Sequence, residues 1–330
     1  MRILHVITAK FPVVGYGGTE RIAYWLGKAQ AEMGHEVSYL CNPGSKLPFA
    51  RTFSIPQKLE DLNPYIPKGT DIVQFYSTPN FKVDTPSLTI IEGNGAPGEK
   101  YLPNTIFASE NHARRHGWTE FVHNGVDLSE YPIKQQKDSY LLFLAKAKWR
   151  VKNLAGSIRI AKAAKLPLHV AGGRAPFWHR GVASHGTIDG EKKIRLIQNA
   201  RALLFPIIWE EPFGIAVIEA LACGTPVIAT PRGALPEILT KNCGVLGNSF
   251  EELVDGVEKA MFISPEACRA RVEEAFSHYK MAEKYLFYYK KILSNGKIRE
   301  GYPAAPIDAD PEKKFYYKNY LAKKITKELV

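Results

Sequence analysis

Two glutamates, Glu211 and Glu219, lie in a segment that the sequence predicts to be the end of a strand followed by a helix. The apolar run 202–208 has the length of a strand, so Glu211 falls at its carboxyl end, where open α/β sheets bind ligands. The pattern that follows predicts a helix over 213–222, which places Glu219 about two turns inside it. Both carboxylates therefore indicate a ligand site at one edge of a parallel sheet.

The predicted helix also offers a site for an anion. Pro212 suits its first position and Gly224 its stop. The amides of residues 213–215 then face outward at the positive end of a helix dipole, which is a receptor for a diphosphate. Carboxylates do not bind phosphate, so the partners of Glu211 and Glu219 are the hydroxyls of a sugar and of a ribose. The segment predicts a sugar-nucleotide site; the alternative is a solvent-facing glutamate pair on an ordinary amphipathic helix.

The composition is that of an ordinary globular protein. With 330 residues and 45% hydrophobic content, the chain buries a large core and divides most naturally into two domains. It has no apolar stretch near the roughly 20 residues that span a bilayer and no signal-peptide pattern, so we expect it in the cytoplasm. The net charge of +11 lies mostly in the second half and the tail. A basic second half fits an anionic nucleotide, whereas a basic tail is equally suited to anionic lipid or nucleic acid. Nucleic acid is not expected as a partner, because no motif for it is present.

Strand-like runs alternate with helical patterns through both halves, which predicts two doubly wound α/β domains with parallel sheets. The first is predicted over 1–135 and the second over 138–280, with the polar stretch 134–139 as the boundary. A helix over about 281–295 follows, and residues 296–330 form a basic tail.

A glycine-rich turn, Gly15 to Arg21, lies between the first predicted strand and the first predicted helix. Without side chains, Gly17 and Gly18 let the backbone come close to a bound anion. Such a loop alone is weak evidence, and a flexible connection is the alternative. No Gly-x-Gly-x-x-Gly leads into an acidic strand end, which disfavours a nicotinamide enzyme.

Spaced motifs in both halves resemble the retaining GT-B glycosyltransferases of family four, the glycosyl transferases group 1. In chain order they are Gly17-Gly18-x-Glu20-Arg21, His123-Asn124-Gly125-Val126-Asp127, Glu211-Pro-Phe-Gly-x-x-x-x-Glu219, Cys223-Gly224-Thr225-Pro226-Val227-Ile228 and Gly233-x-x-Pro236-Glu237. The match covers roughly residues 1–290 and is most specific in the second half. The sequence looks most like a short bacterial branch that includes a sugar transferase of avilamycin biosynthesis.

The resemblance implies a GT-B fold, in which two Rossmann-like domains face a cleft and a C-terminal helix crosses back to the first domain. It implies an acceptor domain in the first half and a nucleotide-sugar domain in the second. Glu211 would hold hydroxyls of the donor sugar, and Glu219 the ribose. The other implied donor-binding positions are glycines and residues at the helix start, namely Gly17, Gly18, Gly172, Gly173, Phe213, Gly214, Ile215 and Ala216. No metal and no cofactor are implied, provided that fixed dipoles and cations meet the charge of the departing nucleoside diphosphate.

The basic residues that would meet this charge depart from the family pattern. The family supplies an Arg and, five residues later, a Lys, whereas this chain has the basic run 146–152. We assign these roles to Lys146 and Lys152, with Lys148 and Arg150 as alternatives. A Lys in place of Arg keeps the charge but loses the two-pronged grip on phosphate. The alternative reading of the run is a solvated basic loop.

A second departure lies in the first half, where the family has a histidine after the strand that leads into the cleft. Here Asn94 occupies the segment, and its amide exchanges hydrogen bonds with a sugar but does not titrate near neutrality. Glu92 is the other candidate for meeting the acceptor hydroxyl, with a purely structural role as the alternative.

The tail contains a basic amphipathic pattern, because Tyr317, Leu321, Ile325 and Leu329 repeat every four residues among lysines. We expect it either to pack on the protein's own surface or to contact a membrane surface or a partner. The pair Asp308 and Asp310 is taken as a coincidental likeness to a metal site. The histidines without ligand spacing are expected to be surface or packing residues: His112, His116, His179 and His185.

These features lead to one main hypothesis and two alternatives. The chain is expected to be a cytoplasmic, metal-independent, retaining hexosyltransferase that uses a nucleoside-diphosphate sugar in bacterial glycoconjugate, polysaccharide or glycosylated-metabolite synthesis. Its acceptor is a saccharide or a lipid-linked molecule, the latter placing it at the inner face of the membrane. A degenerate sugar-nucleotide-binding protein is the first alternative, motivated by Asn94 and the missing Arg. A GT-B-type sugar-nucleotide epimerase is the second. The sugar, the base, the acceptor and the oligomeric state do not follow from the sequence.

Overall fold

The chain forms two compact units, each built on its own parallel sheet. The computed structural model describes residues 1–306 apart from 16, 57 and 176–178. Of these, residues 1–127 and 276–306 make the first unit, and residues 128–275 make the second. The chain thus changes unit directly after Asp127, ahead of the polar stretch at 134–139.

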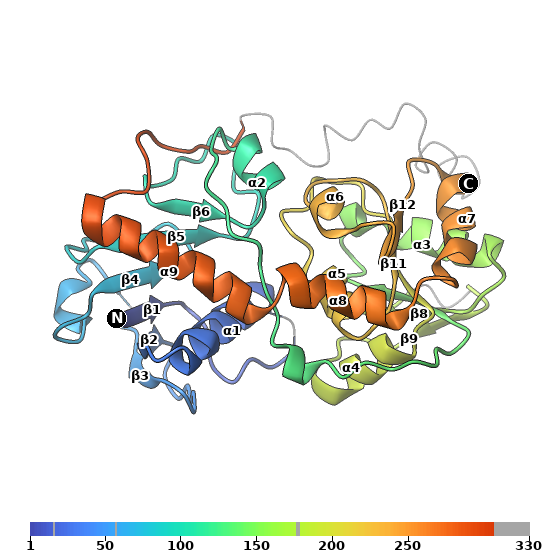
Figure 1. Cartoon of the computed structure of the whole chain (residues 1–330), viewed down its shortest axis with the longest axis horizontal. Coiled ribbons are helices and arrows are strands. Elements are labelled where there is room, and N and C mark those ends of the chain that lie inside the picture. The colour runs from blue at the N-terminus through green and yellow to red at the C-terminus, as the bar shows by residue number, and fades with distance from the viewer. Residues whose placement is uncertain (16, 57, 176–178, 307–330) are drawn as a thin grey trace. The chain divides into compact units, whose positions relative to one another are not determined.

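The first unit contains a six-stranded sheet in the order β3-β2-β1-β4-β5-β6 (Figure 1), with every neighbouring pair parallel. Its strands are β1 Arg2–Val6, β2 Glu36–Cys41, β3 Arg51–Ser54, β4 Ile72–Phe75, β5 Ser87–Ile91 and β6 Thr105–Phe107. Its helices are α1 Gly18–Glu32, α2 Glu110–Arg115 and α9 His278–Asn295, with a 3-10 turn, η1, at Asn63–Tyr65. The strands β1, β4, β5 and β6 are short and mostly buried, because a parallel sheet is covered on both faces, whereas the edge strand β3 is largely exposed.

The second unit repeats the same winding in the order β12-β11-β10-β7-β8-β9. Its strands are β7 Leu141–Leu144, β8 Leu168–Ala171, β9 Val182–Ser184, β10 Ala202–Phe205, β11 Val227–Ala229 and β12 Gly244–Leu246. Its helices are α3 Leu154–Ala163, α4 Gly190–Asn199, α5 Ile215–Ala222, α6 Leu235–Ile238, α7 Phe250–Ala260 and α8 Pro265–Ala275, with 3-10 turns η2 at Leu128–Glu130 and η3 at Arg150–Lys152. Both units therefore have the doubly wound topology that the alternating pattern predicts.

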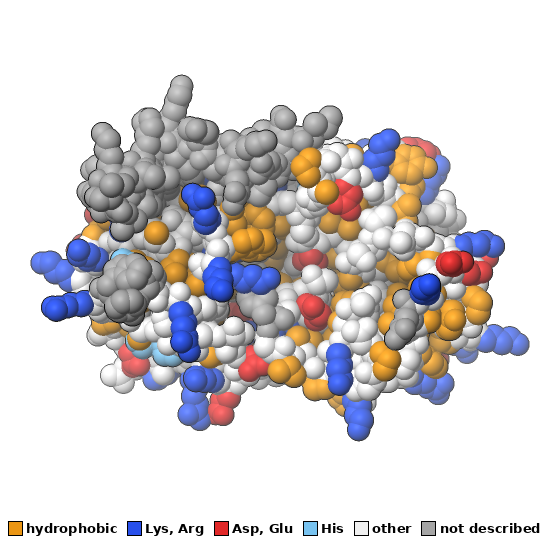
Figure 2. All heavy atoms as spheres, turned by 180° about the vertical axis from the view of Figure 1, so that it is seen from behind, with side chains coloured by type: hydrophobic (Ala, Val, Ile, Leu, Met, Phe, Trp, Pro, Cys, Tyr) orange, Lys and Arg blue, Asp and Glu red, His pale blue; other side chains and the backbone are white. Residues whose placement is uncertain are grey.

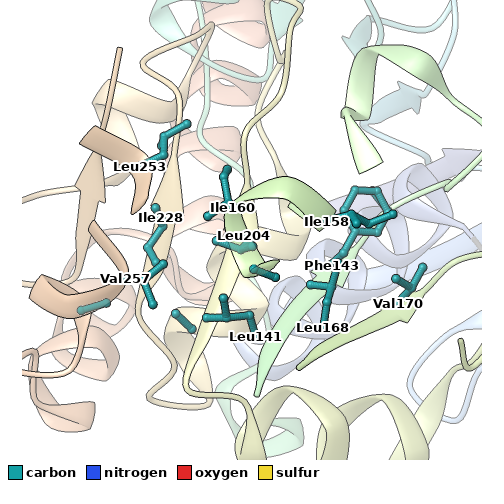
Figure 3. Close-up of a cluster of buried hydrophobic side chains, with 14 residues drawn as sticks. Leu141, Phe143, Ile158, Ile160, Leu168, Val170, Leu204, Ile228, Leu253 and Val257 are labelled. Carbon is teal, nitrogen blue, oxygen red and sulfur yellow. The ribbon is translucent and has the colours of Figure 1, made fainter. Parts of the chain in front are cut away.

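The core of the second unit lies between its sheet and the helices α3 and α7 (Figure 3). Leu141 and Phe143 of β7 and Leu204 of β10 point into it, and each is no more than 1% exposed. Ile160 of α3 and Leu253 of α7 close it from the helix side. Helix α5 packs against β10 and β11 and against α4 and α8. This packing fixes the carboxyl ends of β7 and β10, from which the candidate site is built.

A buried polar network ties α9 to the first sheet, where α9 also packs against α1. The hydroxyl of Tyr289 donates to Oε1 of Gln74 at 2.8 Å and accepts from Nε2 of Gln30 at 3.1 Å. Oε1 of Gln30 lies 2.8 Å from Nε2 of His5, and Nδ1 of His5 lies 2.7 Å from the hydroxyl of Tyr76. Burial lowers the pKa of His5 to about 4, so the ring is neutral near pH 7.

No helix in the described residues is both long and apolar enough to cross a membrane. On the face that Figure 2 shows, the described Lys and Arg side chains are spread over the surface with acidic side chains among them. The tail residues on which we based the amphipathic helix, and the pair Asp308 and Asp310, lie outside the described part of the chain.

Replacing Tyr289 by Phe tests this network. The change keeps the ring but leaves Gln74 and Gln30 with an unsatisfied buried group each, which costs about 1–3 kcal/mol of unfolding free energy. Urea denaturation followed by circular dichroism measures it. Tyr279→Phe is the matched control on the same helix, because the Tyr279 side chain is 44% exposed and its loss should stay within about 0.5 kcal/mol. Equal losses in the two variants would contradict the importance of the network.

Candidate functional site

The loops after β7 and β10 lie side by side at the switch point of the second sheet. β10 pairs with β7 on one side and with β11 on the other. The chain winds outward from β7 through β8 and β9, and outward from β10 through β11 and β12, in the opposite direction. Doubly wound sheets bind ligands at the carboxyl ends of strands where the winding reverses. The candidate site is therefore formed by the loops 145–153 and 206–214.

Lys152 and Glu211 form a buried ion pair across these two loops. Nζ of Lys152 donates to Oε2 of Glu211 at 2.5 Å, and the two side chains are only 7% and 10% exposed. Nε1 of Trp209 donates to the same carboxylate oxygen, also at 2.5 Å. Each charge compensates the other, whereas either alone would be strongly unfavourable at this depth.

Aromatic rings surround the ammonium group of Lys152. Its Nζ lies 4.7 Å from the ring centroid of Trp209, 5.4 Å from that of Phe205 and 5.7 Å from that of Trp149. The rings of Trp149 and Trp209 are 5.2 Å apart. Ring faces attract cations, so these rings hold the ammonium in place.

Asn153 sets the path of the loop that carries Lys152. It adopts a left-handed conformation, with φ 57°, at the N-cap of α3, where its Oδ1 accepts from the amide of Gly156 at 3.0 Å. Its Nδ2 donates to the carbonyl of Pro206 at 2.8 Å, and the amide of Ile208 donates to the carbonyl of Val151 at 2.9 Å. An Asn suits such a position because it tolerates positive φ and caps helices. These bonds join the two loops through their backbones and bring Lys152 to Glu211.

The other basic residues of the run 146–152 are exposed. Lys146, Lys148 and Arg150 all lie at the surface, and Nζ of Lys146 lies 5.4 Å from the ring centroid of Trp149. The structure therefore brings Lys152 together with Glu211 and leaves Lys146 at the edge of the loop.

The helix after Glu211 begins two residues later than the predicted range 213–222. Pro212 lies in the loop, and α5 begins at Ile215 with Gly214 as its N-cap at φ 104°. The chain needs this left-handed turn before it enters the helix, and glycine adopts it without strain. The first amides of the helix, which have no partner within it, are therefore those of Ile215 and Ala216. Gly224, with φ 71°, follows the C-cap as predicted.

Glu219 is also buried and paired, at 4% exposure. Its Oε1 accepts from Nζ of Lys193 at 2.6 Å and from the hydroxyl of Tyr131 at 2.6 Å. Lys193 comes from α4, and its side chain is 9% exposed. The ion pair and the hydrogen bond give this carboxylate partners inside α5, a helix whose other residues are apolar.

Gly172 and Gly173 follow β8 in backbone conformations with φ 100° and 151°. A Cβ on Gly172 would lie 2.1 Å from the carbonyl oxygen of Ala145, and one on Gly173 would lie 2.6 Å from the Cβ of Ala147. Glycine is therefore required so that the loop after β8 can lie against the loop after β7. The two predicted glycines thus border the loop that carries Lys152.

In the first unit, Gly17 and Gly18 stand at the start of α1, with Gly17 as the N-cap. A Cβ on Gly17 would lie 2.9 Å from Oε2 of Glu20 and 3.0 Å from Cγ1 of Val13. Nη2 of Arg21 donates to the carbonyl of Gly15 at 3.2 Å. The side chain of Arg21, which belongs to the same motif, therefore holds this turn through its hydrogen bond to Gly15.

Glu92 and Asn94 lie in the loop after β5. Oε2 of Glu92 accepts from Nδ2 of Asn124 at 2.6 Å. Burial raises the pKa of Glu92 to about 7, against the opposing effect of this hydrogen bond. Oδ1 of Asn94 accepts from Nη1 of Arg115 at 3.0 Å, and its carbonyl lies 3.2 Å from Nε2 of His116. His116 and its neighbour His112 are buried packing residues, as predicted.

The sequence analysis assigned no role to several side chains that contact the candidate residues, among them Trp209, Tyr131, Lys193 and Asn124. Trp209 lies two residues before Glu211 and was visible in the motif, but nothing in the pattern shows that its indole turns toward the carboxylate. Tyr131 and Lys193 lie 88 and 26 residues from Glu219, and Asn124 lies 32 residues from Glu92. Such separations leave no local signal.

Within residues 1–306 that the structure describes, no group of three or more His, Cys, Asp or Glu side chains is arranged to hold a metal ion. The cysteines Cys41, Cys223, Cys243 and Cys268 are buried and free.

Comparison with known proteins follows the division into units. Residues 132–277 match the family model of glycosyl transferases group 1. Among curated relatives, D-inositol 3-phosphate glycosyltransferase of Mycolicibacterium smegmatis is 25% identical over 221 residues, which cover 56% of this chain and 50% of the relative. The chain spans half or less of the length of the first curated relatives that it matches.

Solved structures match over nearly the whole chain. AviGT4, a glycosyltransferase involved in avilamycin A biosynthesis, superposes with a TM-score of 0.75 at 22% identity, covering 89% of this chain and 98% of that one. HepE of Anabaena in complex with UDP-glucose superposes with a TM-score of 0.62 at 14% identity, covering 89% and 99%. Together with the two parallel sheets, these matches show that the chain has the GT-B fold, in which residues 132–277 are similar to the glycosyl transferases group 1.

Proposed function

We propose that this protein is a retaining glycosyltransferase, which moves a sugar from a nucleoside-diphosphate sugar to an acceptor hydroxyl. The observation that carries the proposal is the buried pair of Lys152 and Glu211, at the switch point and beside the start of α5. A carboxylate that accepts hydrogen bonds from sugar hydroxyls and a lysine that attracts phosphate stand side by side there. This combination suits a ligand that has a sugar and a diphosphate in direct succession.

Different residues of the second unit contact the sugar, the ribose and the diphosphate of the donor substrate. Glu211 holds hydroxyls of the sugar, and Glu219 those of the ribose. The diphosphate lies at the start of α5, where the amides of Ile215 and Ala216 point outward. Lys152 has three N–H donors, one of which is bound to Glu211, so the others are available to a phosphate oxygen. Support for such a ligand comes from the solved relative HepE, whose structures hold UDP, UDP with glucose, and UDP-glucose.

The chemical demand on the site is to stabilise the departing nucleoside diphosphate. Its negative charge grows as the bond to the sugar breaks, and fixed positive charges and dipoles stabilise it best in a water-poor site. We assign this role to Lys152 and the helix amides, with Lys146 at the loop edge as a further cation. The reaction on this proposal transfers a hexose and needs neither a metal nor a cofactor.

The acceptor, on this proposal, is a saccharide or a lipid-linked molecule used in bacterial glycoconjugate, polysaccharide or glycosylated-metabolite synthesis. The relative from Mycolicibacterium smegmatis is named for an inositol 3-phosphate acceptor. A cytoplasmic enzyme that meets lipid-linked acceptors would work at the inner face of the membrane.

A degenerate sugar-nucleotide-binding protein is the second candidate, and one observation favours it. Asn94, which stands where the family has a histidine, is held by Arg115 and His116 rather than presented by a flexible loop. A protein of this kind binds the donor without releasing its diphosphate.

Incubation with a panel of nucleoside-diphosphate sugars, with and without mono- and disaccharide acceptors, separates the two candidates. We expect release of the nucleoside diphosphate from at least one donor, measured by a coupled phosphate assay. The rate should be unchanged in EDTA, because the site supplies its own cations. Binding of a donor without any release would favour the second candidate, and loss of release in EDTA would contradict metal independence.

Glu211→Gln keeps the shape of the side chain but removes the charge that orients the sugar. We expect release from the donor to fall by on the order of 100-fold, as when one positioned polar contact in an active site is lost. Affinity for the nucleoside diphosphate alone should change by less than about threefold, since that part contacts other groups. Glu191→Gln is the control, because the Glu191 side chain on α4 is 77% exposed. An equal loss of binding and release in Glu211→Gln would contradict the role.

Glu92 gives a pH test of the acceptor side. Its pKa is raised to about 7, so the carboxyl is protonated below this pH and ionised above it. If the ionised form accepts the proton of the acceptor hydroxyl, the transfer rate falls about tenfold per pH unit below pH 7. Glu92→Gln should be slow and should lose this dependence.

The raised pKa of Glu92 also affects the pH dependence of stability, and this distinguishes a structural role of Glu92 from a catalytic one. A folded-state pKa above the unfolded value of 4.5 costs stability as pH rises from 4.5 to 7. Glu92→Gln should therefore gain up to about 3 kcal/mol of unfolding free energy relative to the wild type over this range. If this gain appears while the pH dependence of transfer survives in the variant, Glu92 is structural only.

A further inference from the structure

The two glutamates of the site are anchored in the same way, although their anchors come from different parts of the chain. In each glutamate, a single carboxylate oxygen accepts two hydrogen bonds, one from a lysine ammonium group and one from an N–H or O–H group of an aromatic side chain. Oε2 of Glu211 takes Lys152 and Trp209, both at 2.5 Å. Oε1 of Glu219 takes Lys193 and Tyr131, both at 2.6 Å.

This anchoring fills one oxygen of each carboxylate and leaves the other open. A carboxylate oxygen has about two lone-pair positions, and the two donors occupy both. Among the described residues, none donates to Oε1 of Glu211 or to Oε2 of Glu219. Neither atom is one of the buried polar atoms without a partner in this part of the chain, so both have access to solvent.

Lys152 and Lys193 compensate the charges of the two carboxylates. Two carboxylates beside a diphosphate would repel it, and the repulsion would be strong because both side chains are at most 10% exposed. With Lys152 on Glu211 and Lys193 on Glu219, each pair has no net charge. The carboxylates then act as hydrogen-bond acceptors for hydroxyls without acting as negative charges toward phosphate.

The two aromatic donors, Tyr131 and Trp209, are held rigidly by their surroundings. A flexible polar side chain would not be held in this way. Tyr131 is 1% exposed, and the guanidinium of Arg269 donates to the carbonyls of Tyr131 and, at 3.2 Å, of Leu128. Trp209 is 8% exposed and packs against Trp149. Each aromatic donor therefore fixes the rotation of its carboxylate and the direction of the open oxygen.

We propose that Tyr131 and Trp209 are positioning residues, which aim the open oxygens of Glu219 and Glu211 at hydroxyl groups of the ligand. The proposal rests on the function proposed above and deepens it. The open oxygen of Glu219 can only accept hydrogen bonds, so it needs a hydroxyl group as its partner. By aiming this oxygen, Tyr131 makes the site select a ribose diol over a pentose that lacks the hydroxyls. Trp209 enforces the placement of the sugar and thereby the rate of its transfer.

Tyr131→Phe tests the first half by isothermal titration with UDP and with 2′,3′-dideoxy-UDP. The wild type should prefer UDP by about tenfold, as expected for hydroxyls bonded to a charged acceptor. In the variant UDP should bind about tenfold more weakly, and the preference should shrink to less than about threefold. If UDP does not bind the wild type, GDP and its dideoxy analogue take its place.

Trp209→Phe tests the second half and keeps most of the aromatic packing around Lys152. We expect kcat for diphosphate release from the donor found in the panel to fall by about tenfold. The dissociation constant of UDP should stay within about threefold, because Trp209 acts on the sugar and not on the nucleotide. This split between kcat and binding would not arise from a general loss of structure.

Tyr140→Phe is the control for both variants. Tyr140 is 7% exposed in the same unit, and its hydroxyl donates to the carbonyl of Leu196 rather than to a carboxylate. It should change neither the preference for the ribose diol nor the split between kcat and binding. Thermal denaturation of all three variants checks that they fold, and if Tyr131→Phe does not fold, the Trp209→Phe result decides.

The outcomes separate this inference from the function on which it rests. Binding of UDP with an unchanged preference in Tyr131→Phe, or an unchanged kcat in Trp209→Phe, overturns the inference and leaves the glycosyltransferase proposal standing. A wild type that binds no nucleoside diphosphate overturns both.

Discussion

The candidate site depends on the ion pair between Lys152 and Glu211. Both groups are buried, and either would be strongly unfavourable alone, so the loops that carry them must form together. The backbone makes this possible, because Asn153 holds Pro206 and the amide of Ile208 holds Val151. The pair therefore joins the ends of two strands that lie side by side at the switch point of the sheet.

The fold supplies the position, and the charges supply the chemistry. Doubly wound sheets offer the same crevice to many ligands, and the side chains placed there decide what it holds. In this chain the second sheet places two carboxylates, each neutralised by its own lysine, near the first turn of an apolar helix. The glycines at 172 and 173 let the neighbouring loop approach without a steric clash. These features support a ligand that combines hydroxyls with a diphosphate.

In the first unit, buried polar side chains hold strands and helices together. His5 and Tyr289 do so through hydrogen bonds, and burial keeps the His5 ring neutral. Glu92 differs from them, because burial brings its pKa near neutrality and leaves its ionisation sensitive to small changes in its surroundings. A pKa of about 7 lets the charge of Glu92 change near neutral pH.

The sequence by itself determined the α/β class and the winding of both halves, and it singled out Glu211, Glu219 and the glycines as candidates, because periodicity and short motifs are local signals. It also placed Lys152 among the candidates but could not choose within the basic run. Only the tertiary structure showed that Lys152 pairs with Glu211, placed the start of α5 at Ile215, and brought Tyr131, Lys193 and Trp209 onto the two carboxylates. The reason is physical: the direction of a side chain, and which charge compensates another across 26 or 88 residues, follow from packing between distant segments. No short stretch of sequence contains that information.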